Sequence, residues 1–81
     1  MATAAAELAG FGLGPRHLRS FRAAADREVG LVEQVVSPLR AGRGGSRSSA
    51  RAEDRAGEIV TVALRLHAAL VRAGLARAGL G

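Results

Sequence analysis

The feature that most constrains this chain is a run of regularly spaced apolar residues in its last third. Between Ala52 and Ala73 these residues recur at alternating steps of four and three, the spacing of a coiled-coil seam. The seam consists of Ala52, Ala56, Ile59, Ala63, Leu66, Leu70 and Ala73. Such a period places them on one side of a helix. The pattern therefore predicts a long helix over residues 50–75 that packs against another helix.

A second apolar stripe lies beside the seam. It consists of Val60, Leu64, His67, Val71 and Leu75. Two neighbouring stripes are typical of a helix that packs against two neighbours, such as an earlier helix of its own chain and a helix of another. We expect Ser48 or Ser49 to cap this helix, with Glu53 and Asp54 near its positive end.

The length of this helix favours a partner. A helix from Ser49 to Leu75 is about 40 Å long at 1.5 Å per residue, whereas a compact domain of 81 residues is about 30 Å across. We therefore expect the helix to overhang, and the simplest cover is an antiparallel helix in a symmetric homodimer. The predicted dimer interface consists of Ile59, Ala63, Leu66 and Leu70.

A second helix is predicted from Pro15 to about Leu39. Proline suits the first helical position, because its missing N–H has no partner there in any helix. Pro38 is expected to kink or end this helix, because it removes one backbone hydrogen bond. The helix is amphipathic, and its apolar side carries Leu18, Phe21, Ala25, Val29, Val32, Val36 and Leu39.

A short helix is predicted over Ala2–Ala9. Two turns are not stable alone in water, so we expect it to dock through Leu8, Phe11 and Leu13. Together the three helices predict an all-α fold: a short helix, a long kinked helix and a long C-terminal helix, arranged as an antiparallel helical dimer.

Composition limits what else can stabilise or occupy the fold. The chain has no cysteine, which excludes disulfides and thiolate metal sites. Its net charge of +5 comes from 12 basic residues, all arginine, and such a surplus suits phosphate-rich partners. The densest basic block is Arg40, Arg43, Arg47 and Arg51.

Few residues suggest chemistry. His17 lies among arginines at a helix start, where a phosphate contact and plain solvent exposure both fit. His67 lies in an apolar stripe, where a histidine is more often a packed residue than a ligand. No nucleophile–base pair and no metal-ligand spacing is present. We therefore predict no enzyme activity, no metal and no cofactor. The glycines around Gly12 are interpreted as a flexible turn rather than a nucleotide loop, because no strand precedes them.

The chain is expected to be cytoplasmic and not to bind a membrane. Its N-terminus lacks the cationic start of a secretory signal and carries Glu7. No apolar run approaches the roughly 20 residues that span a bilayer.

Residues 7–21, ELAGFGLGPRHLRSF, resemble the second half of the winged-helix DNA-binding domain of MerR-type transcriptional regulators. In that family a helix, a Gly-Phe turn and a second helix form the second wing. Residues 23–40, AAADREVGLVEQVVSPLR, and 64–75, LRLHAALVRAGL, are similar to the actinobacterial branch, which includes regulators of cell-division genes.

The resemblance implies functions for both ends of the chain. The second wing would contact DNA phosphates through Gly12, Gly14, Arg16, His17 and Arg19, and the C-terminal helices would form the dimer. We thus divide a single helical domain, 1–81, into a second-wing helix pair (1–24), a linker and dimer helix (25–40), a flexible loop (41–49) and a dimerisation helix (50–75).

The family's helix-turn-helix and first wing have no counterpart in this sequence. They would lie before Met1, so the chain is expected to be a fragment or to start downstream of the true start. DNA binding without the recognition helix is expected to be weak and non-specific. Two other interpretations remain: a stand-alone helical module that forms homo- or mixed dimers, and a basic amphipathic peptide at membranes. Acidic residues such as Glu53 and Glu58 on the polar face disfavour the latter.

Overall fold

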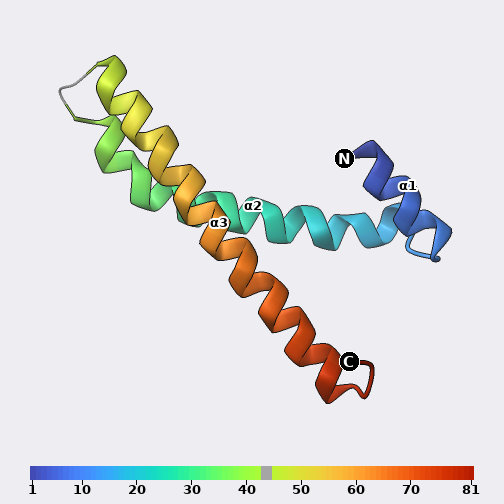
Figure 1. Cartoon of the computed structure of the whole chain (residues 1–81). Helices are drawn as coiled ribbons and strands as arrows, with labels where there is room; N and C mark the ends of the chain where they lie inside the picture. The colour runs from blue at the N-terminus through green and yellow to red at the C-terminus, as the bar shows by residue number, and fades with distance from the viewer. Residues whose placement is uncertain (43–44) are drawn as a thin grey trace. The chain divides into compact units, whose positions relative to one another are not determined.

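The computed structural model describes residues 1–42 and 45–81, which form three helices and contain no strand. They are α1 (Ala2–Gly10), α2 (Pro15–Arg40) and α3 (Ser46–Arg77); Figure 1 shows them in chain order. The predicted all-α fold is confirmed. The chain divides within α2 into two units, residues 1–31 and 32–81, called here the N-terminal and C-terminal units. The sequence had suggested one domain with an internal boundary at residue 24.

The N-terminal unit contains α1, a tight turn and the first half of α2. The turn is a Schellman motif: the Leu13 N–H donates to the Leu8 carbonyl at 2.9 Å, and the Gly12 N–H donates to the Ala9 carbonyl at 3.0 Å. Gly12 has φ of +100°, a conformation that glycine adopts without the steric cost a Cβ imposes. Leu8 and Leu13 are half-buried, as expected, but Phe11 is 86% exposed. The prediction that Phe11 helps to dock α1 is therefore wrong, because the turn directs it to solvent.

Helix α2 begins at Pro15, as predicted, and continues through Pro38 to Arg40. Pro38 offers no N–H to the Gln34 carbonyl, which weakens the last turns. The Ser37 hydroxyl donates to the Glu33 carbonyl at 2.7 Å, a local bond that is often found where a helix bends. The helix therefore ends at Arg40, within the one turn of Pro38 that was predicted.

The C-terminal unit contains the end of α2, the α2–α3 connection and α3. Within it the end of α2 (green) runs beside the start of α3 (yellow), and the rest of α3 extends beyond (Figure 1). Val36 of α2 and Ala52 of α3 are each 2% exposed and form its core. A Cβ added to Gly42 would lie 3.3 Å from the Ser48 Oγ atom, so the connection packs closely against the start of α3.

The start of α3 differs from the prediction. The helix begins at Ser46, with Gly45 as its N-cap and no side-chain cap. Capping by Ser48 or Ser49 is therefore wrong: Ser48 is inside the helix and is 9% exposed. The first turn carries no acidic residue, so the expected placement of Glu53 at the positive end is also wrong. The predicted loop is shortened accordingly, and Arg43 and Gly44 lie outside the described residues.

The C-terminal end of α3 repeats the turn that ends α1. The Leu80 N–H donates to the Leu75 carbonyl at 2.8 Å, and the Gly79 N–H donates to the Ala76 carbonyl at 3.1 Å. Gly79 has φ of +76°. The matching sequences LAGFGL and LARAGL therefore encode the same helix stop, with glycine at the left-handed position.

Candidate functional site

The basic start of α2 presents two arginines to solvent. Arg16 and Arg19 lie in its first two turns, and both are exposed. The turn before them ends at Gly14, directly ahead of Pro15. Two guanidinium groups held at the start of a rigid helix are suited to binding phosphate oxygens, because each presents several N–H donors in a fixed plane.

His17 is bonded to this same turn. Its Nδ1 atom accepts a hydrogen bond from the Gly14 N–H at 3.1 Å, and its own backbone N–H donates to the Gly14 carbonyl at 2.9 Å. The side chain is half-buried, not freely solvated. Among the five predicted phosphate contacts, Gly14 and His17 therefore satisfy each other in this structure, while Arg16 and Arg19 face solvent. Gly12 is exposed, but its N–H donates to the Ala9 carbonyl.

The apolar seam of α3 is covered at its start and uncovered further on. Ala52 is buried, and Ala56, Ile59 and Ala63 are half-buried. Leu66 and Leu70, which continue the same side of the helix, are each 60% exposed. Three alanines and Ile59 thus occupy the covered part of the seam, and two large leucines occupy the uncovered part.

The second stripe of α3 is also exposed. Val60, Leu64, Val71 and Leu75 are between 41% and 55% exposed, and His67 makes an interaction of its own. From about residue 60 onward, the helix therefore presents two adjacent apolar stripes that its own unit leaves accessible. Contiguous apolar surface of this kind is typical of interaction sites.

A hollow lies on α3, and a separate groove lies within the N-terminal unit. On α3, Ile59 and Ala63 line an open hollow of about 430 Å³ together with Val62, Arg55 and Glu58. The last two form an exposed i,i+3 ion pair at 3.8 Å, which contributes little to stability. The hollow lies beside the predicted dimer residues.

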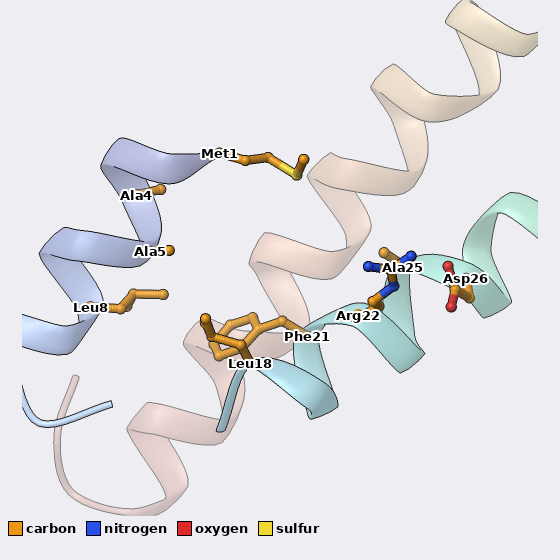
Figure 2. Close-up of a pocket in the computed structure, with 9 residues that line it drawn as sticks. All are labelled: Met1, Ala4, Ala5, Leu8, Leu18, Phe21, Arg22, Ala25 and Asp26. Atoms are coloured by element: carbon orange, nitrogen blue, oxygen red, sulfur yellow. The ribbon is translucent and has the colours of Figure 1, made fainter. Parts of the chain in front are cut away.

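A larger groove of about 590 Å³ lies in the N-terminal unit between α1 and the first half of α2. Figure 2 shows Ala4, Ala5 and Leu8 of α1 directed toward the same space as Leu18 and Phe21 of α2. The groove is lined mainly by apolar side chains, with Arg22 and Asp26 at the α2 side. Phe21 remains 54% exposed, so α1 covers this part of the apolar side of α2 incompletely.

A comparison with known protein families identifies the family of this chain. Residues 1–79 match the family described as Rv1828-like, C-terminal domain. The chain belongs to this family. The match includes both units, and therefore both the basic helix start and the apolar face of α3.

Two curated relatives are similar to this Rv1828-like chain. One is an uncharacterised HTH-type transcriptional regulator of Mycobacterium tuberculosis, Rv1828, and the other is its counterpart Mb1859 of Mycobacterium bovis. Each is 45% identical over 69 residues, which cover 84% of this chain and 27% of the relative. The chain thus spans about a quarter of the length of these relatives. No solved structure matches it significantly.

Helix α3 is long and apolar enough, by length and composition alone, to cross a membrane, a property that the sequence interpretation did not anticipate. Its most apolar 18-residue window has a mean hydropathy of 1.6, and none of it is buried. Arg65 and Arg72 lie on this part of the helix, and each would cost roughly 2.5–3.5 kcal/mol at a bilayer centre. The same composition suits a helix covered by protein, and the relatives are named as transcriptional regulators.

The relatives' names also bear on catalysis, since they describe regulators and not enzymes. In the part of the chain that the structure describes, no group of three or more His, Asp or Glu side chains is placed to hold a metal ion.

Proposed function

We propose that this Rv1828-like chain is the dimerisation and second-wing portion of a MerR-like DNA-binding transcriptional regulator that acts in the cytoplasm. The observation that carries the proposal is the match of residues 1–79 to a family named for the C-terminal domain of a protein whose curated relatives are HTH-type regulators. The MerR assignment rests on the resemblance of residues 7–21 to a second wing.

The dimer proposal is supported by the uncovered seam of α3. Leu66 and Leu70 are mostly exposed. Ile59 and Ala63, earlier on the same side of α3, line its open hollow. An antiparallel second copy of α3 would bury these four residues from both chains in one symmetric contact. It would also cover the part of α3 that its own unit leaves exposed.

The DNA proposal is supported by the exposed arginines at the start of α2. In a dimer, Arg16 and Arg19 provide four guanidinium groups, whereas the Gly12 N–H is bonded to the Ala9 carbonyl and adds no donor. Contacts of this kind bind phosphates and carry no base information. The chain is therefore expected to bind duplex DNA weakly, without sequence preference and with strong dependence on salt.

Light scattering tests whether the chain forms the proposed dimer. A chain of 8.3 kDa should show twice that mass at micromolar concentration, with helical circular dichroism. A folded, stable monomer at this concentration would count heavily against the dimer.

A second function, that of a stand-alone helical module forming homo- or mixed dimers, is favoured by the width of the exposed apolar surface on α3. It predicts the same mass but no affinity for duplex DNA. A titration with labelled DNA at low ionic strength therefore separates the two.

A further inference from the structure

We infer that His17 is a positioning residue: its imidazole fixes the first turn of α2 and so places Arg16 and Arg19, and it does not itself contact phosphate. The part played by the arginines rests on the proposed function. The part played by His17 rests on its bonds to Gly14.

One of the two bonds between His17 and Gly14 is half of a capping box. The other is a backbone bond from the His17 N–H to the Gly14 carbonyl, since glycine has no side chain to supply the second half. Gly14 precedes the first helical residue, Pro15, and is therefore the N-cap, which makes His17 the third residue of the helix. In a capping box the side chain at this third position accepts from the N-cap N–H, as the His17 Nδ1 atom does at 3.1 Å. The box normally uses Glu or Gln there; here a histidine supplies the acceptor.

This bond determines what the ring can do. Because Nδ1 accepts a hydrogen bond, it carries no proton, and the ring proton of the neutral imidazole lies on Nε2. The Gly14 N–H is occupied by the same bond, and Pro15 has no N–H to offer. Neither His17 Nδ1 nor the Gly14 amide is therefore available to a phosphate while the box is closed. The Nε2–H is the one ring donor left, and the substitutions below test whether it is used.

The neighbours of His17 explain why a neutral acceptor suits this position. Arg16 and Arg19 lie within two residues of it, and both are exposed. A glutamate would also accept from the Gly14 N–H, but its negative charge between the arginines would offset their attraction for phosphate. A neutral ring closes the box and leaves the local charge at the helix start positive.

Three substitutions of His17 in the full chain separate positioning from direct contact. His17→Gln keeps a neutral acceptor, His17→Glu keeps an acceptor with a negative charge, and His17→Lys keeps a cation without an acceptor. The readouts are hydrogen exchange of the Gly14 amide by NMR and the affinity for a labelled duplex at several salt concentrations.

The box predicts a distinct result for each variant. With His17→Gln, Gly14 exchange and duplex affinity stay within about twofold of wild type. With His17→Lys, Gly14 exchange accelerates about fivefold or more, the size expected when a helix cap is removed, and duplex affinity falls despite the added cation. With His17→Glu, Gly14 stays protected while duplex affinity falls.

The opposite pattern overturns the inference. If His17→Lys retains duplex affinity while His17→Gln weakens it and reduces the salt slope by about 0.9 for each phosphate that is no longer neutralised, His17 is a phosphate ligand. If Gly14 exchange is the same in wild type and His17→Lys, the box does not form. If the wild-type chain binds no duplex at low salt, the proposed function fails, and Gly14 exchange alone decides the role of the ring.

Discussion

Replacing Leu66 with aspartate tests whether the exposed seam of α3 is a dimer interface. Leu66 is 60% exposed in the single chain, so the fold of the monomer depends on it only in part. Burying that remainder is worth about 1–2 kcal/mol per side chain, taking 1.5–3 kcal/mol for a fully buried leucine. The symmetric contact contains two copies, so removing the side chains alone should cost the dimer about 2–4 kcal/mol.

This free energy corresponds to a rise in the dimer dissociation constant of roughly 30- to 700-fold at 1.4 kcal/mol per tenfold. Aspartate adds to this the penalty of placing an unpaired charge in an apolar contact. Sedimentation equilibrium of wild type and Leu66→Asp over a range of concentrations measures the difference, and circular dichroism reports whether the monomer stays helical. We expect a monomer or an unfolded chain where the wild type is a dimer.

The matched control is Ala69→Asp. Ala69 is exposed and lies outside both apolar stripes, with Arg65 four residues before it and Arg72 three residues after it, so the new charge has favourable helical neighbours. It should leave the dimer intact. If both variants dissociate equally, or if neither does, the seam is not the interface and the reasoning from its exposure is wrong.

Three further predictions concern the arginine pair, the turn after α1 and the core of the C-terminal unit. Replacing both Arg16 and Arg19 with alanine should weaken duplex binding equally on all sequences and flatten its salt dependence, as fluorescence anisotropy would show; a loss confined to one sequence would contradict this. Gly12→Ala should lower stability by about 1–2 kcal/mol, because its φ of +100° disfavours a Cβ; an unchanged thermal midpoint would contradict the role of the turn. Val36→Ala should destabilise the C-terminal unit by about 1–3 kcal/mol in chemical denaturation, since Val36 is 2% exposed, whereas Val35→Ala, at 54% exposed, should have little effect.

Much of the helical organisation was predictable from the sequence because the apolar periods are long. The seam from Ala52 to Ala73 predicts one side of α3 over several turns, and Pro15 marks the start of α2 through its fixed φ. The exposure of Leu66 and Leu70 also follows from length, since α3 is longer than the end of α2 that covers it. Periodicity reports which residues share a side of a helix, whatever covers that side.

The helix ends were less predictable because they depend on backbone geometry. Ser48 and Ser49 were expected as caps, since serine favours that position, but Gly45 ends the connection and the helix begins earlier. The turns after α1 and α3 do have a local signal, the shared pattern Leu-Ala-x-x-Gly-Leu, which is the spacing of a Schellman motif.

The role of His17 was not accessible from residue type alone. A histidine beside arginines fits both a phosphate ligand and a helix cap, and the residue type does not show that Nδ1 accepts from the backbone. The position of His17, three residues after the N-cap, was the available signal. It was weak because capping boxes usually carry Glu or Gln there.

Titration of the wild-type chain against two labelled duplexes, one promoter and one scrambled, tests most directly whether this chain contacts DNA phosphates without reading base sequence. With four arginine contacts per dimer, the logarithm of the affinity should fall with the logarithm of salt concentration at a slope of about −3.6. Raising salt from 50 to 200 mM should then weaken binding about 150-fold on both duplexes. A preference for the promoter of more than about tenfold, or 1.4 kcal/mol, would mean that the chain reads base edges and would contradict the proposed role.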